Sequence, residues 1–118
     1  MINVFEPKIY FKDKLAVFNA LNKKNISGSS KEIKKFENSL AKYFDRTYTV
    51  ALSNGSIALE AALQSLDLNS DDEIIIPSFT IISCLGAVVR SGGKPVFCDV
   101  NEFSWNMTLD DIKKVKTN

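Results

Sequence analysis

Apolar residues recur at the three- and four-residue spacing of an α-helix in several stretches of the chain, and between these stretches they form short continuous runs. The helical spacing predicts helices over residues 13–22, 30–44, 57–66 and 80–90, with a further short helix beginning at Thr108. The second of these is expected to be about 15 residues long. In the third, almost every side is apolar, so we expect it to be buried on most sides by a sheet and by a neighbouring helix or second subunit.

The continuous apolar runs predict three strands, over Tyr48–Leu52, Glu73–Pro77 and Lys94–Val100. Strands that alternate with helices of this length imply crossover connections and a parallel sheet, which is the α/β class. The strands have the composition of strands buried on both faces. Within 118 residues little remains to cover such a sheet, so either another subunit covers it or the chain is the first part of a longer protein. We favour the second alternative.

Polar and small residues predict how these elements begin and end. The segments Ser29 to Glu32 and Thr108 to Asp111 have the pattern of a capping box, in which a hydroxyl and a carboxylate bond each other's backbone amides. Residues 91–93, Ser-Gly-Gly, are typical of a left-handed helix end. Residues 4–12 are expected to form an extended arm, and residues 25–30 a loop of small residues.

Composition and charge exclude several classes of function. The net charge is +1 and the lysines alternate with acidic residues, which gives no basis for nucleic-acid or anionic-membrane binding. The N-terminus lacks the pattern of a signal peptide, and no apolar run could span a bilayer, so we expect a cytoplasmic protein. Cys84 and Cys98 lack metal-site spacing and the chain has no histidine, so we expect no disulfide and no metal site. Ser-His and Cys-His nucleophile systems are excluded on the same ground.

The stretch Ser53–Leu59 is the candidate for chemistry, because a predicted strand ends there and a helix begins. The first amides of a helix lack backbone partners and the helix dipole favours negative charge, so a tight turn containing Gly55 suits a phosphate group. The alternative is a structural turn, since any junction between a strand and a helix favours a small polar residue and a glycine.

Three segments together resemble a known family. Tyr48–Leu59, Asp72–Thr80 and Gly93–Val100 are similar, in order and spacing, to the first third of the DegT-type nucleotide-sugar aminotransferases. Earlier segments agree with the family's N-terminal arm, its Ser/Gly loop and the helix behind it: Glu6-Pro7, Ile26–Ser29 and Phe36-Glu37. The resemblance covers essentially the whole chain. Within the family, the region Trp105–Met107 is most similar to perosamine-synthase relatives.

The resemblance implies the fold and the reaction. Residues 1–118 would be the N-terminal arm, first helices and first three strands of the large domain of a fold-type I pyridoxal-phosphate (PLP) transferase, an incomplete domain with a mostly parallel sheet flanked by helices. The family uses PLP, works as a homodimer and moves an amino group, usually from glutamate, to a nucleotide-linked keto sugar. Such reactions belong to surface-polysaccharide or deoxyaminosugar biosynthesis.

The resemblance also implies binding residues. Gly55, Ser56 and Ile57 match the turn whose backbone amides hold the cofactor phosphate, and Ser56 keeps the hydroxyl of the family's usual threonine. Ile81 matches the position where the family places an aromatic ring over the pyridine, so here an aliphatic side chain would cover the cofactor by dispersion. The loop that would border the sugar-nucleotide pocket contains Ser27, Gly28 and Ser29.

The catalytic residues of the family lie beyond the region that this chain matches. The lysine that binds PLP covalently and the carboxylate that pairs with the pyridine nitrogen have no counterpart here, so we expect no catalytic residue in the chain and no transaminase activity from it alone. The alternative is a non-catalytic remnant or assembly module, with the apolar helices at 57–66 and 79–89 as its docking surface. A Rossmann-type nucleotide-binding domain is disfavoured, because Ser53 to Ser56 supply one glycine where that fingerprint has three.

Overall fold

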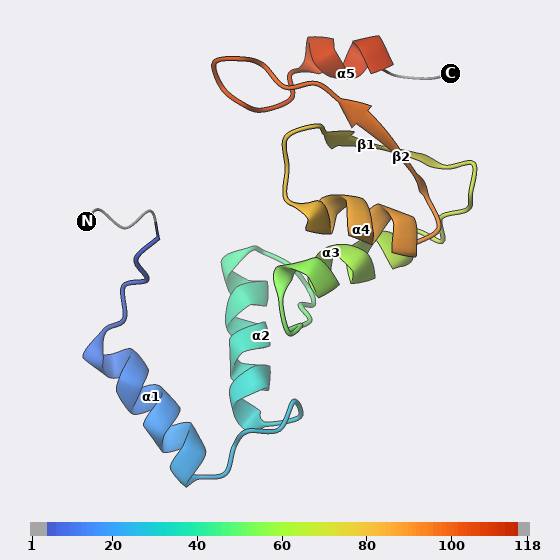
Figure 1. Ribbon diagram of the computed structural model, residues 1–118. Helices are drawn as coiled ribbons and strands as arrows, with labels where there is room; N and C mark the ends of the chain where they lie inside the picture. The colour runs from blue at the N-terminus through green and yellow to red at the C-terminus, as the bar shows by residue number, and fades with distance from the viewer. Residues whose placement is uncertain (1–4, 116–118) are drawn as a thin grey trace. The chain divides into compact units, whose positions relative to one another are not determined.

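Three helices come first along residues 5–115, the part of the chain that the computed structural model describes, and strands and helices alternate after them (Figure 1). The chain divides into two units, Met1–Ala51 and Leu52–Asn118, and each is described by itself. None of the helices in the described residues is long and apolar enough to cross a bilayer. In chain order the elements are α1 (Phe11–Asn22), α2 (Lys31–Tyr43), α3 (Gly55–Gln64), β1 (Glu73–Pro77), α4 (Ile82–Arg90), β2 (Lys94–Cys98) and α5 (Leu109–Val115).

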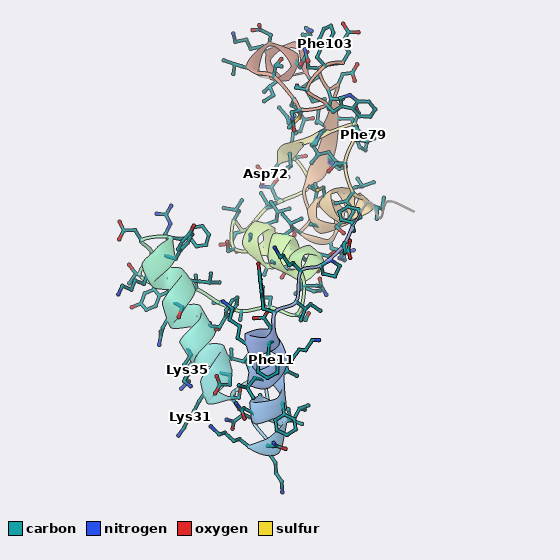
Figure 2. The ribbon with its side chains drawn as sticks, turned by 90° about the vertical axis from the view of Figure 1, so that its left-hand side faces the viewer. Phe11, Lys31, Lys35, Asp72, Phe79 and Phe103 are labelled. Carbon is teal, nitrogen blue, oxygen red and sulfur yellow. The ribbon has the colours of Figure 1, made fainter. Side chains whose placement is uncertain are left out.

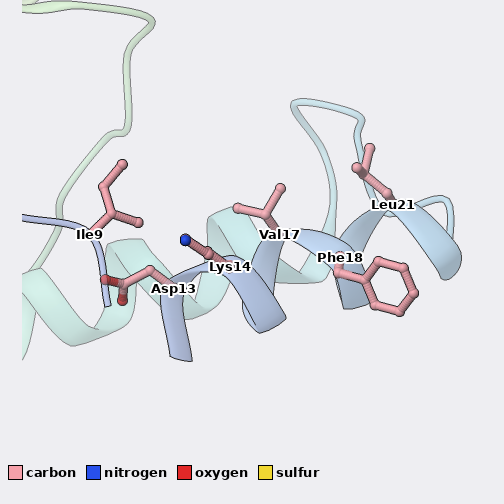
Figure 3. Close-up of a pocket in the computed structure, with 6 residues that line it drawn as sticks. All are labelled: Ile9, Asp13, Lys14, Val17, Phe18 and Leu21. Carbon is pink, nitrogen blue, oxygen red and sulfur yellow. The ribbon is translucent and has the colours of Figure 1, made fainter. Parts of the chain in front are cut away.

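Residues 5–10 have no regular structure, as predicted for the arm, but its predicted last two residues, 11 and 12, belong to α1. The predicted start at residue 4 lies outside the described residues. Helix α1 begins at Phe11 rather than Asp13, because the Asp13 carboxylate caps it by accepting the backbone N–H of Tyr10 at 2.8 Å. Its apolar side chains stay exposed and border an open pocket of about 560 Å³ (Figure 3). The residues that line this pocket are Ile9, Asp13, Lys14, Val17, Phe18 and Leu21.

Helix α2 confirms the second predicted helix, but the predicted capping box at its start is wrong. Ser30 is the N-cap residue and its side chain makes no capping hydrogen bond. The Ser29 hydroxyl instead lies 3.0 Å from the Ser27 hydroxyl, and the Glu32 carboxylate accepts from Lys35 Nζ at 3.3 Å. Both partners of the predicted box are therefore engaged elsewhere, in an ST-type turn and in an ion pair on the helix surface.

The predicted strand Tyr48–Leu52 is also wrong as a description of this structure. The segment has no regular hydrogen-bonded structure, and Tyr48 is 85% exposed. Its polar groups turn back to α2 instead: the Ala51 N–H donates to Glu37 Oε1 at 2.9 Å, and the Thr49 hydroxyl donates to the Glu37 carbonyl oxygen. A strand needs a neighbour to pair with, and no strand within the described residues pairs with this segment.

The second unit contains the parallel sheet that the sequence predicts. β1 and β2 pair in parallel, with Ile75 opposite Val96, and α4 forms the connection between them (Figure 1). The turn from α4 into β2 depends on Gly92, whose φ of +88° lies in the left-handed region, as predicted. The buried core consists of side chains from β1, α4 and β2: Ile76, Ala87, Val88 and Cys98.

Helix α3 packs along α4, but the described residues of this chain do not bury it on most sides, and its burial by a second subunit stays a prediction. No residue of α3 is buried, and the apolar Leu59 stays 43% exposed. An ion pair joins the two helices: Nε of Arg90, in α4, donates to Oε2 of Glu60, in α3, at 2.6 Å. Within the described residues α4 is the main neighbour of α3, whose apolar composition suits contact on several sides.

The capping box of α5 is confirmed and makes the last helix sensitive to acid. The Asp111 carboxylate accepts from the Thr108 N–H at 3.2 Å, and the Asp111 N–H donates to Thr108 Oγ1 at 3.3 Å. The Thr108 hydroxyl, followed by Lys114, holds the pKa of Asp111 below its ordinary value of 3.8. Folding thus favours the charged carboxylate, and the stability it adds is present above pH 3.8 and lost as the pH falls through the lowered pKa.

We therefore expect Asp111→Asn to destabilise the chain at pH 7 and to have little effect at a pH well below the lowered pKa. The measurement is denaturant unfolding followed by circular dichroism between pH 7 and pH 2. Asp110→Asn is the matched control, because Asp110 is in the same turn and its bond among the described residues is to Lys113, on the helix surface. An equal loss of stability from Asp111→Asn at both pH extremes would contradict the role of this carboxylate.

Candidate functional site: the first turn of α3

Asn54 determines how α3 begins. Its backbone is extended, and its side-chain oxygen accepts the Ile57 N–H at 3.0 Å while its carbonyl accepts the Ala58 N–H at 3.1 Å. An asparagine in this position is a favoured N-cap because it satisfies one of the amides that the helix leaves unpaired. The Ile57 amide, predicted to hold phosphate, is thus already hydrogen-bonded to Asn54 in this structure.

The amides of Gly55 and Ser56 remain available at the same helix end. Within the described residues neither has a hydrogen-bond acceptor. Apart from its chain neighbours and its own helix backbone, no atom lies within 4 Å of where a Cβ on Gly55 would be, and Gly55 lines an open pocket. Two unpaired amides at the positive end of a ten-residue helix, next to open space, form a geometry that suits an anionic oxygen.

An open pocket of about 380 Å³ lies at this helix end, between α3 and α4. It brings together three of the residues that the resemblance assigned to the cofactor: Gly55 and Ser56 from the first turn of α3, and Ile81 from the start of α4. Ile81, the N-cap residue of α4, is 67% exposed and contributes an aliphatic wall. We call this the α3–α4 pocket; its lining residues are Gly55, Ser56, Leu59, Ile81 and Ser83.

Ser83 is a pocket residue that sequence reasoning missed. Its hydroxyl lies 2.7 Å from the Ser56 hydroxyl, and both side chains are half-buried. The sequence contains a weak signal for it, because Ser83 follows Ile81 by two positions and lies in the first turn of a predicted helix. The contact between Ser83 and Ser56 could not be predicted from the sequence, because it depends on how α3 and α4 pack.

The predicted substrate loop lies in the first unit and is exposed. The Ser29 N–H donates to Ser27 Oγ at 3.3 Å, which fixes a tight turn around Gly28. A Cβ atom on Gly28 would meet nothing within 4 Å. The assignment of this loop to a sugar nucleotide stays a prediction.

Polar and aromatic groups gather where β1 and β2 end, in segments that the prediction did not assign to a site. Ser78 follows β1, and its hydroxyl lies 3.4 Å from Asp99 Oδ1, which follows β2. The Phe79 ring meets the Trp105 ring edge to face, with 4.9 Å between ring centroids. Cys98, the last residue of β2, is fully buried, and this burial raises the pKa of its thiol. The thiol therefore stays protonated and unreactive at neutral pH.

The described lysines have the surroundings of surface charges. Lys31 and Lys35 project away from α2 (Figure 2), and Lys35 pairs with Glu32. Lys94 bonds Glu73 at 2.7 Å, and this hydrogen bond raises the pKa of Lys94. A covalent-catalysis lysine needs the opposite shift, toward the neutral amine.

Comparison with known proteins identifies the family. The model of the DegT/DnrJ/EryC1/StrS aminotransferase family matches residues 8–118. The chain belongs to this family. Among curated relatives, the GDP-perosamine synthase of Escherichia coli O157:H7 is 35% identical over 117 residues, which are 99% of this chain and 32% of the relative. The chain thus spans about a third of the length of this relative.

Solved structures of the family share the fold. An aminotransferase from Psychrobacter cryohalolentis matches with a TM-score of 0.84 and 35% identity, over 94% of this chain and 28% of the other. NtdA from Bacillus subtilis, with bound cofactor PMP, matches with a TM-score of 0.80 and 29% identity, over 92% of this chain and 26% of NtdA. The predicted fold class is therefore confirmed: the chain has the fold of the N-terminal part of the PLP-dependent aminotransferases.

The α3–α4 pocket fits the cofactor of this family. Unpaired amides at Gly55 and Ser56 suit a phosphate, and the open space before Gly55 leaves room for one. Ile81 offers an apolar surface in the same pocket for a flat ring. The chemistry of the residues present thus agrees with phosphate and ring binding at one place.

Proposed function

We propose that this chain forms part of a PLP-dependent aminotransferase that moves an amino group, with glutamate as donor, to a nucleotide-linked keto sugar. The enzyme would be a cytoplasmic homodimer of deoxyaminosugar or surface-polysaccharide biosynthesis, similar to perosamine synthases. The α3–α4 pocket carries this proposal: residues assigned separately to the phosphate and to the ring, Ser56 and Ile81, line one pocket. Residues 1–118 would be an incomplete PLP-transferase domain.

The roles of the pocket residues follow from their surroundings. The amides of Gly55 and Ser56 would bind phosphate oxygens and the Ser56 hydroxyl would donate a further hydrogen bond. The Ile81 side chain would lie against the ring and exclude water from that face. When bound, PLP supplies an electron sink for the amino-acid carbon. The Ile57 amide could join only if Asn54 gave up its hydrogen bond, so we assign the binding to the first two amides.

The loop Ser27, Gly28 and Ser29 is proposed to border the sugar nucleotide. Its exposed hydroxyls and the open space at Gly28 support a binding role, because a bulky polar ligand needs both. The covalent lysine and the carboxylate partner of the ring are proposed to come from sequence outside residues 1–118. The described lysines support this, since all of them are exposed and four of them form ion pairs with nearby carboxylates.

The test is a hybrid subunit, in which residues 1–118 replace the matching segment of the E. coli O157:H7 GDP-perosamine synthase. We expect the hybrid subunit to bind PLP, to form a borohydride-stable adduct on a lysine outside residues 1–118, and to aminate the relative's nucleotide sugar with glutamate. The chain by itself should form no such adduct and show no turnover. Peptide mapping by mass spectrometry locates the modified lysine in each case.

Two results would contradict the proposal. An adduct on a lysine of residues 1–118 would show that the chain contains its own covalent residue. A well-folded hybrid subunit without PLP binding would show that the α3–α4 pocket is not a cofactor site, and would favour the alternative of a non-catalytic assembly module. The relative with its own N-terminal segment is the control for both measurements.

A further inference from the structure

The Ser56–Ser83 hydroxyl pair links the phosphate end of α3 to the first turn of α4. The two oxygens are 2.7 Å apart, both side chains are half-buried, and both line the α3–α4 pocket. The Ser83 hydroxyl has no other hydrogen bond within the described residues. A half-buried hydroxyl whose single partner is another hydroxyl at a proposed binding site calls for a functional explanation.

The direction of this hydrogen bond depends on what occupies the pocket. Each hydroxyl has one proton and can both donate and accept, so between the two serines alone either can be the donor. An ionised phosphate oxygen can only accept. If the Ser56 hydroxyl donates to phosphate, its proton is committed, and the 2.7 Å contact persists only when Ser83 donates to Ser56 Oγ.

We propose that Ser83 is a positioning residue for phosphate binding, and that it acts by donating to Ser56 Oγ so that the Ser56 proton points at the phosphate. This inference rests on the proposed function. Donation from Ser83 also polarises the Ser56 O–H bond and makes it a stronger donor, because hydrogen bonds in a chain reinforce one another. Ser83 would thereby act from α4 on a contact made by α3, without touching the phosphate itself.

The test uses pairs of ligands that differ only in the phosphate group. The full chain is titrated with pyridoxamine 5′-phosphate and with pyridoxamine, and the amide resonances of Gly55 and Ser56 are followed by NMR. Neither ligand carries an aldehyde, so no lysine is required. We expect Ser83→Ala to weaken pyridoxamine 5′-phosphate binding about threefold to tenfold, the usual range for one hydrogen bond, and to leave pyridoxamine binding unchanged. Ser83→Thr keeps the hydroxyl and should bind pyridoxamine 5′-phosphate with the wild-type affinity.

A double-mutant cycle separates positioning from a structural effect. In a Ser56→Ala background, Ser83→Ala should cause no further loss of affinity, because the hydroxyl on which it acts is gone. The amide resonances of β1 and β2 report whether each variant keeps the fold. An equal loss in both backgrounds, or a loss for both ligands, would overturn the role of Ser83. If the wild-type chain binds the two ligands with equal affinity, the proposed phosphate site is refuted. If the wild-type chain prefers pyridoxamine 5′-phosphate and Ser83→Ala has the same affinity as the wild type, only the role of Ser83 is refuted.

Discussion

Gly55→Val should abolish PLP binding by the hybrid subunit while leaving its fold intact. Gly55 lines an open pocket, and apart from its chain neighbours and its own helix backbone no atom lies within 4 Å of where a Cβ would be, so the change should be tolerated by the fold. The larger side chain would fill the space in front of the Gly55 and Ser56 amides, where the phosphate is proposed to lie. We expect at least a hundredfold weaker PLP binding, measured by the cofactor absorbance at equilibrium.

Two controls separate this effect from loss of helix stability. Ala62→Val places the same β-branched side chain in α3 away from the pocket, and it should keep the wild-type affinity for PLP. Gly55→Ala adds a single methyl group and should give an intermediate loss. Unchanged PLP affinity in a folded Gly55→Val hybrid would refute the phosphate site at this turn.

Local sequence signals predicted the second unit well because its elements find their partners within the chain. The apolar run Glu73–Pro77 became β1 with the predicted bounds, and the next run became β2 over Lys94–Cys98. The connection between them is a single helix with a glycine at its end, and Gly92 has the left-handed φ that its sequence pattern predicts. Each of these features depends on neighbours that are close in sequence.

Elements whose partners lie elsewhere could not be predicted in the same way. Tyr48–Leu52 has the composition of a strand, but composition shows only that a segment is able to pair with another strand. In this structure its polar groups form hydrogen bonds with Glu37 instead. The capping box at α2 failed because Ser29 bonds Ser27, a competition between two local patterns that the sequence does not rank. The apolar surface of α3 remains exposed, because no element of the described residues covers it.

The candidate site was predictable where it depends on a turn and unpredictable where it depends on packing. The pattern at Gly55 and Ser56 follows from the end of one apolar run and the start of a helix. The contact of Ser56 with Ser83 joins residues far apart in sequence and required the α3–α4 packing. The cap that Asn54 places on the Ile57 amide was also missed, and it changes which amides are available for the phosphate.

Asn54→Asp should separate the stability of α3 from its capacity to bind phosphate. Aspartate caps a helix as well as asparagine does, and a negative charge at this end is favoured by the helix dipole, so we expect the fold to be retained. The same charge lies beside the amides of Gly55 and Ser56 and would repel a phosphate. Two unit charges about 4 Å apart repel by about 4 kcal/mol at an effective dielectric constant near 20, enough for a loss of at least a hundredfold.

The measurement compares PLP with pyridoxal, which lacks the phosphate, in the hybrid subunit and its variants. Asn54→Asp should weaken PLP binding and leave pyridoxal binding unchanged, and Asn54→Ser, a neutral cap, should bind PLP as the wild type does. Raising the salt concentration should recover part of the loss, because the repulsion is screened. If Asn54→Asp bound PLP as tightly as Asn54→Ser, the phosphate would lie elsewhere, and α3 would begin with an ordinary structural cap rather than a cofactor site.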